Sequence, residues 1–169
     1  RNRITYGLTS CFIGFKAANN GSIFVISNLN ALILIKNCIF SQNVVNSYGG
    51  AIYIYNSSNI TIMYCTFNNN IAQYGGSIYY FNDLGDKLFV KIFSNIFQND
   101  YAKISGGSLM FSSNLPNDFV NSNNSFIDNK AELYGDHYAS EPYRIIYLGD
   151  QEAKKKYDIE DFRNGPFMT

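Results

Sequence analysis

Residues 37–43 read Asn-Cys-Ile-Phe-Ser-Gln-Asn, and related heptads recur three times further along the chain. The later copies begin near Cys65, Asn95 and Asn124, and each holds a phenylalanine followed within three residues by asparagine or aspartate. The phenylalanines, spaced by 27, 30 and 29 residues, are Phe40, Phe67, Phe97 and Phe126. A period of about 30 residues is typical of repeat architectures in which each unit packs against its neighbours.

A glycine turn follows each copy and leads into strand-forming residues. The turns read Tyr48-Gly49-Gly50-Ala51-Ile52, Tyr74-Gly75-Gly76-Ser77-Ile78, Ser105-Gly106-Gly107-Ser108-Leu109 and Tyr134-Gly135-Asp136-His137. A weaker first copy begins at Cys11 and has Ile13 and Lys16 where Phe and Asn are expected. The runs rich in Ile, Val, Tyr and Phe that predict strands are Ser22–Ser27, Ala31–Lys36, Ala51–Tyr55, Asn59–Met63, Ser77–Phe81, Lys87–Phe93 and Ser108–Ser112.

Three short strands per unit of about 29 residues, stacked about 4.8 Å apart, predict a parallel β-helix. We therefore expect an all-β, right-handed, single-stranded parallel β-helix of about five coils, each of roughly 27–31 residues, over residues 1–144. Residues 145–169 are expected to form a C-terminal cap or the start of a following module. Within them, the charged stretch 150–157 predicts a short helix.

Equivalent residues of successive coils lie above one another in such a fold. We predict one ladder of Cys11, Cys38, Cys65, Asn95 and Asn124, and a second of the four phenylalanines. The cysteines are expected inside the wall as small apolar residues. A disulfide between Cys11 and Cys38 is an alternative, because a Cα spacing of about 4.8 Å permits one.

The strand after each glycine turn alternates between two rows. We expect Ile23, Ile52, Ile78 and Leu109 to face the interior, and an outer row, the contact stripe, to consist of Phe24, Tyr53, Tyr79 and Met110. Two interpretations stay open for the stripe. It either supports the sheet by cross-strand stacking or contacts a partner, another copy or a carbohydrate.

Composition narrows the function classes. Thirteen Lys and Arg balance thirteen Asp and Glu, so no excess positive charge favours nucleic acid as a partner. The 23 asparagines and 14 tyrosines favour strands and turns over helices. The chain opens at Arg1 without a methionine or a signal-peptide apolar region, which predicts an excerpt of a longer protein. We expect further coils or modules of the parent chain, or neighbouring copies, to contact it.

The Gly-Gly-Ala-Ile turn alternating with Phe-x-x-Asn resembles the repeats of the chlamydial polymorphic outer-membrane proteins. It resembles more closely the Asn-rich β-helix repeats of large ciliate surface proteins. The resemblance covers roughly residues 11–144, and residues 134–144 look like the segment that closes such a β-helix. It implies an extracellular or cell-surface location.

Four Asn-x-Ser/Thr sequons are glycosylation candidates on a eukaryotic secretory route. Asn20 and Asn56 lie at predicted turns and are the better acceptors, whereas Asn59 and Asn123 abut predicted strands. Asn, Ser and Thr are so abundant that chance alone would produce several sequons.

Catalytic β-helices cluster carboxylates, a basic residue and often Ca²⁺ on one outer face. Here only Asp100 and Asp128 are expected to approach each other, and no arginine lies between Arg3 and Arg144. We predict no catalytic, cofactor or metal residues. The sequence favours a non-enzymatic structural or adhesive segment of a larger surface protein, in a filament or surface layer. The alternative is a carbohydrate-active β-helix whose catalytic face lies outside this segment.

Overall fold

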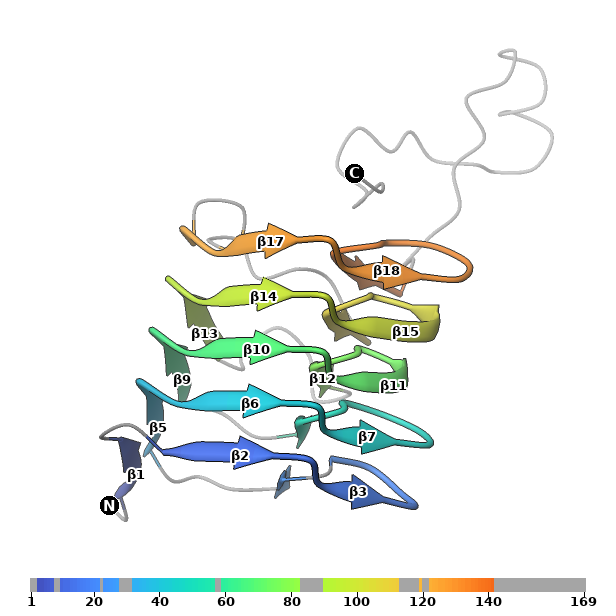
Figure 1. Ribbon diagram of the computed structural model, residues 1–169. Coiled ribbons are helices and arrows are strands. Elements are labelled where there is room, and N and C mark those ends of the chain that lie inside the picture. Colours follow the sequence, from blue (N-terminus) through green and yellow to red (C-terminus); the bar gives the residue numbers. More distant parts are fainter. Residues whose placement is uncertain are drawn as a thin grey trace, which may run out of the picture.

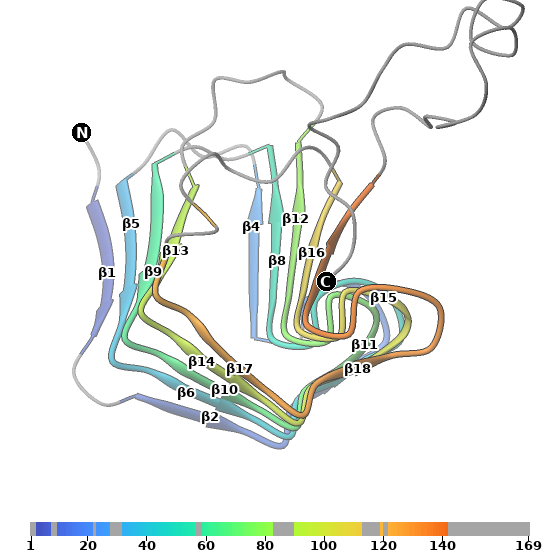
Figure 2. The same ribbon diagram turned by 90° about the horizontal axis from the view of Figure 1, so that it is seen from above.

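Successive turns of the chain wind around one axis, and each strand pairs in parallel with its counterpart one turn later (Figure 1). The computed structural model describes residues 3–7, 10–21, 23–27, 32–56, 59–82, 90–112, 119 and 122–141. These residues form strands and turns without a helix, which confirms the all-β class. Viewed down the axis, the chain turns anticlockwise as it rises toward the viewer, so the β-helix is right-handed (Figure 2).

Four parallel sheets form the walls. Sheet A contains β1 (Arg3–Gly7), β5 (Leu32–Lys36), β9 (Ile60–Met63) and β13 (Val90–Phe93). Sheet B contains β2 (Cys11–Ile13), β6 (Ile39–Ser41), β10 (Thr66–Asn68), β14 (Ile96–Gln98) and β17 (Ser125–Ile127). Sheet C contains β3 (Lys16–Ala17), β7 (Val44–Val45), β11 (Ile71–Tyr74), β15 (Tyr101–Ser105) and β18 (Lys130–Ala131). Sheet D contains β4 (Phe24–Ser27), β8 (Ile52–Tyr55), β12 (Ile78–Phe81), β16 (Leu109–Phe111) and β19 (Tyr138–Ser140).

One strand from each sheet makes one coil. Coils 1 to 4 comprise β1–β4, β5–β8, β9–β12 and β13–β16, and the described strands of coil 5 are β17–β19. These four full turns and one partial turn are close to the predicted five. The expected three strands per unit is wrong, because a bend after each sheet B strand separates an additional short strand in sheet C. The predicted module at 145–169, its helix and the boundary at 144 lie outside the described residues.

Left-handed residues make the bends at both ends of sheet B. The corner between sheets A and B is made by Asn37, Tyr64, Ser94 and Asn123, with φ between 53° and 57°. The corner between sheets B and C is made by Gly14, Gln42, Asn69, Asn99 and Asp128. Asn, Asp and Gly adopt this conformation at the lowest cost, which accounts for part of the asparagine content of the chain.

Stacked phenylalanine rings run through all five coils and form the axis of the core. Their centroids are 5.1, 4.8, 4.7 and 5.2 Å apart from Phe12 through Phe40, Phe67 and Phe97 to Phe126. This spacing is close to that of neighbouring strands. Phe12, not Ile13, is therefore the first member, because Phe12 pairs with Phe40 in the register of β2 and β6. Aliphatic side chains from sheets A and D surround the stack.

The glycine pairs lie in tight turns between sheets C and D, which we call the C–D turns. The first glycine of each pair is left-handed, as at Gly75 with φ 61°. The second has no room for a side chain, since a Cβ on Gly76 would overlap the carbonyl oxygen of Gly107 in the next coil. In Figure 2 the C–D turns curl toward the outside of sheet D.

Candidate functional site

A buried polar ladder runs along the inside of the bend between sheets B and C. Its members are Asn43, Asn70, Asp100 and Asn129, one from each of coils 2 to 5. Asn43 donates its backbone N–H to Oδ1 of Asn70 at 3.1 Å. The N–H of Asn70 donates to Oδ1 of Asp100, and that of Asp100 to Oδ1 of Asn129, both at 2.9 Å. We call this the amide ladder.

The asparagine side chains also link each coil to the preceding one. Nδ2 of Asn70 donates to the carbonyl oxygen of Phe40 at 3.0 Å, and Nδ2 of Asn129 to that of Phe97 at 3.0 Å. The sequence offset of three residues from each phenylalanine signals these positions. In coil 1 that position holds Phe15, whose N–H donates to Oδ1 of Asn43 and whose side chain is half exposed. Lys16, expected there from the sequence, pairs with Val44 one position later.

Asp100 is the one carboxylate in the amide ladder. Its Oδ2 accepts a hydrogen bond from Oγ of Ser77 at 2.6 Å, and its Oδ1 accepts the N–H of Asn70. Burial raises the pKa of Asp100 to about 7, and these hydrogen bonds offset part of the rise. Asp128 is exposed on the left-handed corner, so the predicted approach of Asp100 and Asp128 is wrong.

A second ladder occupies the corner between sheets A and B. Cys38 donates its N–H to Sγ of Cys65 at 3.5 Å, Cys65 to Oδ1 of Asn95 at 2.9 Å, and Asn95 to Oδ1 of Asn124 at 3.0 Å. Burial raises the pKa of the Cys65 thiol to about 12, which favours the neutral thiol.

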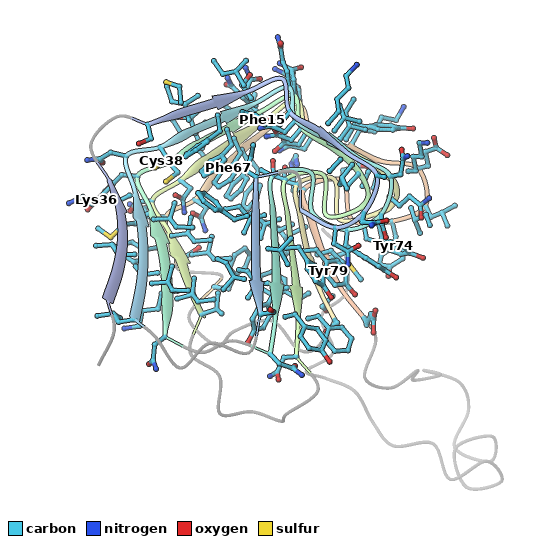
Figure 3. All side chains as sticks on the ribbon, turned by 90° about the horizontal axis from the view of Figure 1, so that it is seen from below. Phe15, Lys36, Cys38, Phe67, Tyr74 and Tyr79 are labelled. Carbon is cyan, nitrogen blue, oxygen red and sulfur yellow. The ribbon has the colours of Figure 1, made fainter. Side chains whose placement is uncertain are left out.

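The predicted place of Cys11 in that ladder is wrong. Cys11 pairs with Ile39 and is exposed, because the repeat from coil 1 to coil 2 is one residue longer than the cysteine spacing suggests. All three cysteines are free, so the structure does not contain the Cys11–Cys38 disulfide. Figure 3 labels Cys38 and Phe67, both of which are buried, on the inner side of the wall.

The predicted contact stripe is largely covered. Tyr79 and Met110 are 4% and 1% exposed, because Tyr48, Tyr74 and Tyr134 at the C–D turns pack against their row. The rings of Tyr48 and Tyr79 lie 4.6 Å apart, and Figure 3 shows Tyr74 and Tyr79 outside the coil interior. The row therefore packs within a second, smaller apolar cluster.

The first member of the stripe also differs from the prediction. Phe24 pairs with Ile52 and packs against the core, whereas Val25 pairs with Tyr53 and is 57% exposed. Ile23 packs against the core as predicted, but it lies level with Ala51 and not with Ile52. The half-buried Tyr53 belongs to the covered cluster, and burial raises its pKa.

The sequons rank differently from the prediction. Asn56 is buried and Asn20 half-buried, whereas Asn59 and Asn123 are exposed in left-handed turns with φ 61° and 57°. A glycan needs an exposed amide, so the burial of Asn56 counts against the expectation that it is a better acceptor. Asn59 and Asn123 abut strands as predicted, yet both are exposed.

The polar groups outside the two ladders do not form one cluster. Tyr101 donates its hydroxyl to the carboxylate of Glu132 on the outside of sheet C. An open recess of about 450 Å³ at the C-terminal end is lined in part by Asp128, Tyr134, Asp136 and His137.

The described part of the chain has no group of three His, Cys, Asp or Glu side chains that could hold a metal ion. Nor does that part contain a helix of the length and apolarity that a membrane span requires.

Residues 37–55 match the Chlamydia polymorphic membrane protein (Chlamydia_PMP) repeat. The match runs from the left-handed Asn37 through β6, β7 and the glycine pair to the end of β8, which is most of one coil. No curated protein and no solved structure matches the chain. The chain is a parallel β-helix repeat protein whose repeat resembles that of the chlamydial polymorphic membrane proteins.

Proposed function

We propose that this chain is a non-catalytic structural or adhesive β-helix segment of a larger extracellular or cell-surface protein. The observation that carries the proposal is the phenylalanine stack, which continues in register through all five coils. Each coil is joined to the next by parallel backbone pairing, by stacked rings and by side-chain ladders. Such a unit resists bending and separation along its axis, which suits a spacer or a rod.

The chemistry of the side chains supports a structural role. Asp100 has both carboxylate oxygens engaged by Asn70 and Ser77 inside the wall, away from any outer-face substrate. The exposed Asp128 makes a corner, and Glu132 accepts from Tyr101. Each of these three acidic residues therefore has a structural contact or position within the β-helix.

The similarity to a repeat of membrane proteins supports a surface location for the parent protein. We propose that other coils or modules of the parent chain, or neighbouring copies in a filament or surface layer, contact coil 1. Phe15 and Val25 are 50% and 57% exposed in this coil.

Asn59 and Asn123 are the proposed glycan acceptors on a secretory route. Carbohydrate is a further proposed ligand of the outer surface.

Incubation of the chain with neutral and acidic polysaccharides, with and without Ca²⁺, tests the non-catalytic assignment. We expect no new reducing ends and no unsaturated products. An activity that is lost in Asp128→Asn, with the melting temperature unchanged, would contradict the proposal and favour a carbohydrate-active β-helix. The matched control is Lys130→Gln, a neighbouring exposed residue that also loses one charge.

A further inference from the structure

We propose that the outer face of sheet B binds a second copy of this chain whose β-helix axis runs in the opposite direction. The outward positions of the five strands form two rows, and Figure 1 shows these strands side by side. None of these outward positions holds a charged residue. Four of them hold Ile13, Ile39, Ile96 and Ile127, which are between 37% and 56% exposed. Exposed apolar side chains on a face without charge are typical of a protein contact surface.

The two rows have a pattern that is nearly the same in both directions along the β-helix axis. From coil 1 to coil 5 the row that starts at Cys11 reads Cys, Ile, Thr, Ile and Ser, and the row that starts at Ile13 reads Ile, Ser, Asn, Gln and Ile. A twofold axis parallel to the strands at coil 3 would place Ile39 opposite Ile96 of the second copy. The same axis would place Ile13 opposite Ile127. An isologous dimer requires a self-complementary pattern of this kind.

The distribution of charge along the β-helix axis favours the antiparallel orientation. Residues 1–82, which include coils 1 to 3, contain four Lys or Arg and no Asp or Glu, a formal charge of +4. Residues 83–141, which include coils 4 and 5, contain four Lys and eight Asp or Glu, a formal charge of −4. In an antiparallel pair the positive part of each copy lies beside the negative part of the other, so the two copies attract each other.

An arrangement with the two β-helix axes parallel fits the face less well. A twofold axis along the β-helix would place the two rows opposite each other, so that Ile39 faces Ser41 of the second copy. In the same way Ile96 would face Gln98. Apolar side chains would then cover polar ones, and parts of equal charge would lie together. The side-chain pattern and the charge distribution therefore both favour the antiparallel pair.

The small size of the face predicts a weak contact. Five strands about 4.8 Å apart, with three to five residues of about 3.3 Å across them, give a face of roughly 20 by 10–17 Å. Interfaces of this size belong to the weak and transient class, so we expect a dissociation constant on the order of 100 µM. The inference rests on the proposed surface location, because copies held close together on a surface have an effective concentration that makes such a contact stable.

Equilibrium sedimentation of the full chain from about 10 µM to about 1 mM tests whether the pair forms. Ile39→Lys and Ile96→Glu each place an unpaired charge in the uncharged face, and we expect each to raise the dissociation constant about tenfold. The double variant places the two charges opposite each other across the twofold axis and should regain most of the affinity. Leu32→Lys is the matched control, since Leu32 is an exposed apolar residue of sheet A, and it should leave the dissociation constant unchanged.

Chemical cross-linking of thiols tests the orientation. Residue Thr66 lies at the twofold axis, so Thr66→Cys in a Cys11→Ser background should be linked to its counterpart by a short bismaleimide, which can join sheets about 10 Å apart. In the unsubstituted chain, the exposed Cys11 should not be linked to Cys11 of the second copy, because coil 1 lies opposite coil 5. Lys91→Cys in the same Cys11→Ser background, at an exposed position of sheet A, is the control for random reaction.

The contrary outcomes separate this inference from the proposed function. An unsubstituted chain that stays monomeric at about 1 mM would overturn the pair but not the structural role, which the polysaccharide assay tests separately. Association that persists in Ile39→Lys and Ile96→Glu but is lost in Phe15→Lys would overturn the sheet B surface and support the proposed contact at coil 1. Cross-linking of Cys11 to Cys11 in the unsubstituted chain would overturn the antiparallel orientation.

Discussion

Coil 3 and coil 1 follow the same backbone path but hold their side chains differently. In coil 3, Phe67 is fully buried between two rings and Asn70 bonds to both neighbouring coils. In coil 1, Phe12 is half-buried and Phe15 replaces the asparagine. The backbone path is therefore the same in both coils, although coil 1 has no asparagine at this position and its Phe12 ring stacks on one neighbouring ring only.

The largest expected effect is the loss of a ring from the middle of the stack. Phe67→Ala removes a fully buried side chain, and we expect the free energy of unfolding to fall by about 3–5 kcal/mol. Phe12→Ala, the matched change in coil 1, should cost only about 1–2 kcal/mol because its ring is partly exposed. Urea denaturation measures both. Equal losses would show that coils 1 and 3 do not differ in packing.

The second-largest loss of stability is expected when a methyl group is added to the second glycine of a C–D turn. Gly76→Ala forces its Cβ against the carbonyl oxygen of Gly107, and we expect a loss of about 2–3 kcal/mol. Gly14→Ala in coil 1 has no atom within 4 Å of the new Cβ and carries only the left-handed strain at φ 74°, about 1 kcal/mol. Thermal melting curves of the two variants measure the difference. The reverse order would show that backbone strain outweighs contact between coils.

The amide ladder predicts a pH dependence. Burial raises the pKa of Asp100 from 3.8 to about 7, so the native state binds more protons than the unfolded state between these values. The contribution of protonated Asp100 to the free energy of unfolding is fully present below about pH 4 and is lost as pH rises toward about 7. Asp100→Asn should remove this loss and stabilise the protein by about 1–3 kcal/mol near pH 8. Its new Nδ2 can donate to the Phe67 carbonyl, as in the neighbouring coils.

Denaturant titrations at several pH values test the sign. The exposed Asp128→Asn is the control and should leave the pH profile unchanged. A destabilised Asp100→Asn at about pH 8 would mean that the carboxylate bonds to Ser77 and Asn70 are stronger than the cost of its burial.

The smallest effect concerns the left-handed corners. Gln42 has φ 56° at the position held by Asn69 and Asn99 in coils 3 and 4. Gln42→Asn should stabilise the chain by about 0.5 kcal/mol, and Asn99→Gln should destabilise it by a similar amount, because asparagine tolerates this conformation better. Chemical denaturation at high precision measures both signs. Changes of the same sign would show that local contacts, not backbone preference, govern the corner.

The sequence alone determined the repeat and hence the fold class. The phenylalanine period, the glycine pairs and the strand-like runs are local, and their spacing leaves a parallel β-helix as the architecture that brings equivalent residues together. Six of the seven predicted runs contain their observed strand within two residues at each end, as β5 does within 31–36. The equal spacing of Cys11, Cys38 and Cys65 predicts a repeat of 27 residues from coil 1 to coil 2, whereas the observed repeat there is 28 residues, from Phe12 to Phe40.

Only the tertiary structure decided which positions are covered. Alternation along a strand separates two faces, but it does not show that the C–D turns curl back over Tyr79 and Met110. Nor does it show that Asp100, three residues after Phe97, is buried, while Asp128, two residues after Phe126, is exposed. Burial depends on residues that are distant in sequence and near in space. The roles of Asp100 and Tyr79 therefore become visible only when the coils are stacked.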